Sequence, residues 1–332
     1  NMLILNDINS YSFISKHDLL FVSKDKNKII KESDISRRIL FYDIAKLKKL
    51  YNTKNLDKPK IENEENLKLF YLEENSLYSS DMYLSKDENF LFIESGDHSN
   101  NEIKLISIKN FLNSGNKNIN TLIKMKPDII NGIAKRGGMF YILSNLDSDN
   151  KYIYQCSSNR VCDSDSGDGD GDNNMKIVYK PKDGRFISDF TCFKDFMIVC
   201  EKYSGKSYLY LINNYDFSKK NRKSLTYFNK LNNFHISILS KYSDYNSREF
   251  LFTISSIGSI LKLFKYNIDS GESHLIFKKR LRNFHDDLYT GKVITGVLKD
   301  KNYINTKRNS VKLPITYYYD KNLYNTKSKF KD

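Results

Sequence analysis

The chain has 332 residues, 39% of them hydrophobic, and its 24 Tyr and 21 Phe exclude a wholly disordered chain because disordered segments are poor in aromatic residues. It lacks the roughly 20 consecutive apolar residues of a membrane-spanning helix, and the opening Asn1–Leu5 lacks the basic start of a signal peptide. The 54 Lys and Arg outnumber the 40 Asp and Glu, which gives a net charge of +14. We therefore expect a soluble, cytoplasmic, globular protein that makes no membrane contact.

Short apolar runs rich in Ile, Leu, Phe, Tyr and Val follow one another along the chain, separated by polar turns. Runs of this length and composition predict β-strands. In chain order, the predicted strands are Leu19–Ser23, Ile39–Ile44, Leu67–Leu72, Phe90–Glu94, Ile103–Ile108, Met139–Leu143, Tyr152–Cys156, Phe196–Cys200, Ser207–Ile212, His235–Leu239, Glu249–Ile254, Leu261–Tyr266, His274–Phe277, Lys292–Leu298 and Lys312–Tyr319. Only Ile44–Tyr51 and Asn118–Lys126 could form short helices.

The predicted strands group into recurring units. Three of them are Met82–Ile108, Phe190–Ile212 and Phe250–Phe277, and the last contains a hairpin turn at Asp269–Glu272. Units of about 40 to 50 residues are typical of propeller blades, whereas sandwich strands do not group in fours. The sequence predicts an all-β chain with propeller blades over residues 1–300.

Polar insertions interrupt the predicted blades near residues 52–66, 113–120 and 157–174. The last contains an acidic run of Asp, Ser and Gly from Asp163 to Asp172. A calcium loop of the EF-hand type would need Gly at its sixth position and Glu at its twelfth, and no register of this run supplies both. We interpret the run as a solvated insertion and predict no metal site there.

The positive charge is scattered through every segment. Its densest cluster is Lys219–Lys223, in a polar loop between two apolar strands. A charge excess without a basic run or a recognition motif is weak evidence for nucleic-acid binding, so we predict no nucleic-acid partner. A basic, nucleic-acid-binding propeller remains a lesser alternative, for which affinity would fall steeply with salt.

The four cysteines form no Cys-x-x-Cys pair and have no His near them at metal spacing, which argues against a metal site. They are Cys156, Cys162, Cys192 and Cys200. Without a visible signal peptide, we expect reduced thiols. Cys192 and Cys200 fall in apolar strands, where we expect them to pack as small hydrophobic residues.

The chain shows no catalytic machinery. It has no Gly-x-Ser-x-Gly, Gly-x-Gly-x-x-Gly, phosphate-binding loop or His-Glu-x-x-His motif. The five dispersed histidines are His17, His98, His235, His274 and His285. The carboxylate pairs Glu73–Glu74 and Asp286–Asp287 would point to opposite faces of a strand rather than form a dyad. We predict no catalytic, cofactor-binding or metal-binding residue, and no cofactor.

From Tyr11 onward, the chain resembles the β-propeller of the prolyl oligopeptidase family of serine peptidases, most closely that of oligopeptidase B. The resemblance rests on the order and spacing of six stretches, since no single motif suffices. They are Phe13–Asn27, Arg37–Ile44, Leu67–Ile108, Gly132–Asn145, Asp189–Ile212 and His235–Lys279. The tail, with Leu313–Tyr319, resembles the crossover into the hydrolase domain, so residues 301–332 are expected to begin that domain.

Several positions depart from the family pattern. Arg37-Arg38-Ile39 stands where the family has Arg-Pro, and Ile254-Ser255-Ser256 replaces Tyr-Ser-Ser. The Ser, Asp and His of the family's triad match no position in this chain. The resemblance therefore implies a propeller, possibly an incomplete ring of the family's seven blades, that would gate short peptides toward a hydrolase domain of its own or of a partner.

The leading hypothesis is the propeller region of an oligopeptidase B-like serine peptidase, whose preference for cleavage after Lys or Arg is implied by resemblance alone. Whether the chain belongs to an active enzyme is left open. The alternative is a stand-alone, non-catalytic propeller that binds proteins or peptides. The two differ in whether the reading frame continues into a Gly-x-Ser-x-Gly strand-turn-helix.

Overall fold

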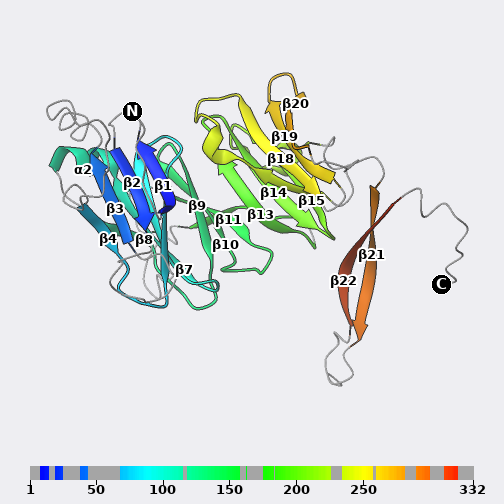
Figure 1. Ribbon diagram of the computed structural model, residues 1–332, viewed down its shortest axis with the longest axis horizontal. Coiled ribbons are helices and arrows are strands. Elements are labelled where there is room, and N and C mark those ends of the chain that lie inside the picture. Colours follow the sequence, from blue (N-terminus) through cyan, green and yellow to red (C-terminus); the bar gives the residue numbers. More distant parts are fainter. Residues whose placement is uncertain are drawn as a thin grey trace, which may run out of the picture. The chain divides into compact units, whose positions relative to one another are not determined.

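The computed structural model describes residues 8–14, 19–24, 38–43, 68–114, 118–157, 162, 175–182, 184–225, 234–256, 259–280, 289–299 and 310–320. Within these ranges the chain forms five four-stranded antiparallel sheets and one two-stranded sheet (Figure 1). The predicted all-β class and the propeller-like blades are confirmed.

Each four-stranded sheet takes its strands consecutively from the sequence. The first contains β1 (Ile8–Ile14), β2 (Leu19–Lys24), β3 (Arg38–Asp43) and β4 (Lys68–Leu72), and the second contains β5 (Ser79–Leu84), β6 (Phe90–Gly96), β7 (Asn101–Ser107) and β8 (Asn120–Ile123). The third contains β9 (Asn131–Arg136), β10 (Met139–Ser144), β11 (Tyr152–Ser157) and β12 (Lys176–Tyr179). The fourth contains β13 (Phe186–Cys192), β14 (Phe196–Tyr203), β15 (Lys206–Asn213) and β16 (Arg222–Ser224), and the fifth contains β17 (His235–Ile238), β18 (Glu249–Ser256), β19 (Ser259–Asn267) and β20 (Ser273–Lys278).

The blade period is close to the expected one. The second to fifth sheets start at residues 79, 131, 186 and 235, which lie 52, 55 and 49 residues apart. The predicted units fall within the second, fourth and fifth sheets, and the predicted hairpin at Asp269–Glu272 joins β19 to β20. The final sheet pairs β21 (Tyr289–Lys299) with β22 (Ser310–Asp320).

The helix expected as an alternative at Asn118–Lys126 is wrong. This stretch contains β8, which pairs with β7 and buries Leu122 and Ile123. A helix does occur just before it, as α2 (Ile108–Ser114), and two 3-10 turns lie at Lys219–Asn221 and Ser240–Tyr242. The second helix alternative, Ile44–Tyr51, lies outside the described residues, as do 52–66 and nearly all of 157–174.

The chain divides into two compact units, residues 1–146 with 154–177 and residues 147–153 with 178–332. Each has an apolar core between the faces of two successive sheets. In the first unit Phe21, Phe41, Phe70 and Phe111 pack edge to face or tilted, between β1–β4 and β5–α2. In the second unit, side chains of β14 and β15 pack against those of β17 to β19. Face-to-face packing of consecutive blades is the arrangement that a propeller requires.

Candidate functional site

The first strands of consecutive sheets approach one another in both units. In the first unit β1 contacts β5, and in the second unit β13 contacts β17. In a propeller, the blades surround a central channel, so strands that converge in this way are those that lie next to its axis. The exposed side chains of the first strands are therefore the candidate functional surface of each unit.

In the first unit this surface is partly aromatic. Tyr11 and Phe13 stand two positions apart on β1, so they share a face, and they are 67% and 44% exposed. On β5, Asp81 is also exposed. Two exposed rings on β1 and an exposed carboxylate on the neighbouring β5 can contact apolar and basic groups of an extended peptide.

In the second unit four polar residues lie close to one another on β13, β14 and β17. His235 Nε2 and Ser237 Oγ are 2.9 Å apart, and both residues belong to β17. Desolvation, and then the positive charge of Lys202, lowers the pKa of His235. Asp189 as a whole residue is exposed. Desolvation of its carboxyl group by the surrounding protein nevertheless raises the pKa of Asp189 to about 6. The Phe190 amide and the charge of Lys202 lower this pKa, but by less.

The His235–Ser237 pair does not constitute a catalytic triad. No carboxylate is bonded to His235 among the described residues, and the imidazole lies on an exposed strand face without the buried acid that would orient it. His98 is exposed, and His274 Nε2 lies 3.9 Å from Glu272 Oε2 with both side chains exposed. His17 and His285 lie outside the described residues. His235 and Ser237 can still donate hydrogen bonds to a bound peptide and accept hydrogen bonds from it.

The sequence-adjacent carboxylates Glu73 and Glu74 point to different environments, as expected for neighbours in extended chain. Glu73 is 8% exposed and accepts hydrogen bonds from Tyr71 and Ser95, whereas Glu74 is exposed. Desolvation raises the pKa of Glu73, but the hydrogen bonds from Ser95 and Tyr71 outweigh it and the net pKa is lowered. Glu73 is thus a hydrogen-bonded structural anion. The Asp286–Asp287 pair lies outside the described residues.

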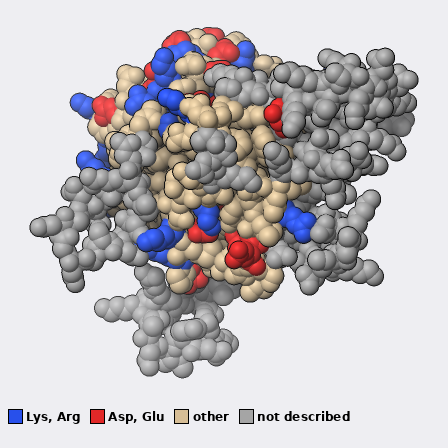
Figure 2. All heavy atoms as spheres, turned by 90° about the vertical axis from the view of Figure 1, so that its left-hand side faces the viewer, with Lys and Arg blue, Asp and Glu red and all other residues tan. Residues whose placement is uncertain are grey.

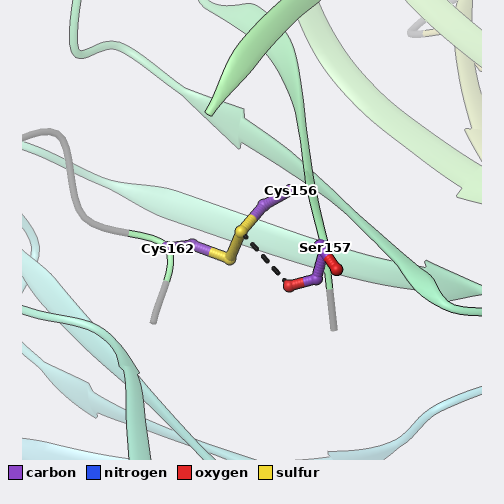
Figure 3. The surroundings of a disulfide bond; sticks show 3 residues. All are labelled: Cys156, Ser157 and Cys162. Atoms are coloured by element: carbon purple, nitrogen blue, oxygen red, sulfur yellow. Dashed lines mark hydrogen bonds between the residues drawn. A yellow bond between two sulfur atoms is a disulfide. The ribbon is translucent and has the colours of Figure 1, made fainter. Parts of the chain in front are cut away.

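The expectation of reduced thiols is wrong for two of the four cysteines. Cys156, at the end of β11, forms a disulfide with Cys162, and the Ser157 carbonyl oxygen lies 3.6 Å from Cys156 Sγ (Figure 3). Cys162 also donates its backbone N–H to Leu122 of β8. Sequence reasoning missed the pair because the expectation of reduced thiols rested on the lack of a visible signal peptide, and a single sequence does not show which cysteines lie close together. Cys192 and Cys200 are buried, as predicted, and neither takes part in a disulfide.

Charged residues of both signs occur on the part of the surface that Figure 2 shows. Blue and red side chains lie next to one another there, with uncharged residues between them. Over the described residues, no group of three or more His, Cys, Asp or Glu is placed to hold a metal ion. None of the described helices has both the length and the apolar character needed to cross a membrane.

The model of the prolyl oligopeptidase N-terminal β-propeller domain matches residues 38–279, well over half of the chain. The chain belongs to this family. No curated protein sequence matches it.

Solved structures resemble the chain over almost its whole length. They include oligopeptidase B from Trypanosoma brucei with covalently bound antipain (TM-score 0.70, 15% identity, 96% of this chain and 40% of that one). Oligopeptidase B from Leishmania major matches with TM-score 0.68 and 16% identity, over 96% of this chain and 39% of that one. Prolyl oligopeptidase B from Galerina marginata matches with TM-score 0.65 and 10% identity, over 94% and 39%.

These identities show a common fold. The chain spans about 40% of the length of the peptidases that it matches. The expected resemblance to the family propeller is confirmed, and the activity of the whole peptidases does not follow from it.

Proposed function

We propose that this chain is the propeller region of an oligopeptidase B-like serine peptidase, and that it controls the entry of short peptides to a hydrolase domain. The observation that carries the proposal is the convergence of the first strands, β1 on β5 and β13 on β17, in a chain of the peptidase propeller family. A channel bounded by folded blades admits an extended peptide and excludes a folded domain, because its walls cannot part without disrupting the packing between blades.

The surface chemistry of the first strands suits this role. Tyr11 and Phe13 offer exposed rings, and His235 and Ser237 offer hydrogen-bonding groups. This combination favours weak contact with many peptide sequences. Cleavage after Lys or Arg rests on the likeness to oligopeptidase B, and the residues that would select it belong to the hydrolase domain.

The length of the native polypeptide tests the proposal. The protein would be enriched from its source, mapped by mass spectrometry and treated with a serine-reactive phosphonate probe. Peptides that extend well beyond Asp332, together with probe labelling, would support a peptidase. Native termini that coincide with this chain, and no labelling, would contradict it and favour the stand-alone, peptide-binding propeller.

The cytoplasmic location stays a prediction, and the Cys156–Cys162 disulfide weighs against it because such bonds persist chiefly in oxidising compartments. Alkylation in denaturant of the protein enriched from its source, before and after reduction, gives the answer, because the buried Cys192 and Cys200 react only once the chain is unfolded. Two additional alkylated cysteines after reduction would favour an oxidising compartment, whereas four thiols alkylated without reduction would favour the cytoplasm.

A further inference from the structure

A cluster of cations stacked on tyrosine rings lies along the connection from β12 to β13 and at the start of β16. Lys180 and Lys182 follow β12, Arg185 precedes β13, and Arg222 begins β16, the outermost strand of its sheet. All four residues belong to the second compact unit. We call them the rim cations.

Each rim cation lies over the ring of a different tyrosine. The Arg185 and Arg222 guanidinium carbons are both 3.9 Å from the ring centroids of Tyr208 and Tyr179. The Lys180 and Lys182 ammonium groups are 4.9 Å and 5.6 Å from the centroids of Tyr152 and Tyr210. Stacking on a ring restricts a long side chain, so these cations lose little further freedom when they bind an anion.

One buried carboxylate, that of Glu201, binds a tyrosine and an arginine of the cluster. Glu201 is completely buried, accepts a hydrogen bond from Tyr179 OH at 2.7 Å, and lies 3.3 Å from Arg185 Nη1. Arg185 Nη1 also donates to Tyr210 OH, and Arg222 Nη1 donates to the Lys180 carbonyl oxygen. Because Glu201 has no access to solvent, it offsets one of the four positive charges without occupying their outer side.

The rim cations retain donors for an external partner. Lys180 and Lys182 are exposed, so their ammonium groups can reach a partner, and Arg222 is half-buried. Arginine presents a planar fork of N–H groups that matches a carboxylate, and the structure already shows Arg185 paired with one, in Glu201. An extended chain with several carboxylates could therefore contact more than one rim cation at once.

We propose that the rim cations form a docking site for an acidic, extended peptide segment of a partner protein. A nucleic acid fits less well, because single strands bind by stacking bases on aromatic rings, and each of these four rings already carries a cation on its face. None of the rim cations is among the first-strand residues assigned to the peptidase role, so either proposal can fail without the other.

The test measures fluorescence anisotropy of a dye-labelled peptide of alternating Glu and Gly as the full chain is added. Lys180→Ala/Lys182→Ala removes two exposed ammonium groups and leaves the buried network in place. We expect binding roughly fivefold weaker, since two surface charges contribute about 0.5 kcal/mol each. Lys278→Ala/Lys279→Ala removes the same charge from exposed positions at β20 and should leave binding unchanged.

The acidic run that precedes β12 could itself occupy the rim cations and compete with the added peptide. The same measurements are therefore repeated in a variant of this protein in which the run is neutralised. In it, Asp163, Asp165, Asp168, Asp170 and Asp172 become Asn. The proposal is supported if the original chain or the Asp→Asn chain binds the Glu peptide, and if in that chain Lys180→Ala/Lys182→Ala weakens binding whereas Lys278→Ala/Lys279→Ala does not. Three outcomes overturn it: no binding by either chain, equal weakening in both lysine variants, or tighter binding of single-stranded DNA of the same charge.

Discussion

The Tyr179 hydroxyl group makes a polar contact that links β12, the last strand of the third sheet, to β14 of the fourth. It donates to Glu201, whose carboxylate is fully buried. Tyr179→Phe would leave that carboxylate oxygen without its donor, which costs about 1–3 kcal/mol of unfolding free energy. Urea denaturation followed by circular dichroism measures the loss.

The matched control is Tyr203→Phe. Tyr203 is 48% exposed at the end of β14, so loss of its hydroxyl should change the unfolding free energy little. Equal effects of the two substitutions would show that the Tyr179–Glu201 hydrogen bond does not stabilise the blade.

Asp189 gives the folded chain a pH dependence of defined sign. Desolvation raises the pKa of its carboxyl group to about 6, above the ordinary 3.8, so the folded state binds more protons than the unfolded state between these values. Its contribution to stability is therefore greatest below pH 4 and is lost as the pH rises through 6. Asp189→Asn should stabilise the chain more at pH 7.5 than at pH 4.5.

Urea midpoints of both proteins at the two pH values measure this difference. Because Asp189 is exposed as a residue, solvent screens part of the effect, and only the sign is predicted. A variant that gains equal stability at both pH values would contradict the assignment.

At the scale of elements, the Cys156–Cys162 disulfide joins the end of β11 to a residue that is hydrogen-bonded to β8. A bond that closes so short a loop restricts the unfolded chain by roughly 2 kcal/mol. Cys156→Ser/Cys162→Ser should lower the unfolding free energy by about this amount. Dithiothreitol should destabilise the original chain similarly and leave the double variant unchanged, as thermal melting can show.

Which strands the sequence predicts depends on how deeply each is buried. β14 is easily predicted because six consecutive residues, Phe196 to Glu201, are buried and five of them are apolar. The sequence pattern does not predict the first strand of four of the five four-stranded sheets, namely β1, β5, β9 and β13. They carry polar residues such as Ser79 and Asp81 on the exposed face, and such residues also predict turns.

The candidate surfaces were harder to predict than the fold for the same reason. His235 and Asp189 were ordinary polar residues in the sequence, and only the contact of β13 with β17 brings their strands together. The rim cations come from segments about 40 residues apart, as the bond from Arg222 to Lys180 illustrates. A single sequence contains no local signal for such a contact.

At the scale of the whole molecule, the stability of a propeller depends on the contacts between consecutive blades. In the first unit Lys135 of β9 pairs with Asp87, in the turn between β5 and β6, at 2.7 Å, and their side chains are only 6% and 10% exposed. The Lys135 ammonium group also lies 4.9 Å from the Phe90 ring centroid. This ion pair links the second sheet to the third in a nearly dry environment.

Desolvation alone would raise the pKa of Asp87, but the hydrogen bonds from Lys135, Ser85 and Asn89 outweigh it and lower the pKa below 3.8. A lowered acid pKa stabilises the folded state above the unfolded value, and this contribution is lost as the pH falls through the folded pKa. The link between the two blades should therefore weaken only in strong acid.

A double-mutant cycle separates the interaction energy between Asp87 and Lys135 from the cost of burying each charge. Asp87→Asn leaves Lys135 buried without its counter-charge, so we expect a loss of about 3 kcal/mol or more, whereas Asp87→Asn/Lys135→Met should recover much of it because no buried charge remains. Urea denaturation at pH 7 gives the four free energies. If the double variant is as unstable as the sum of the single variants, the two residues act independently and another contact joins these blades.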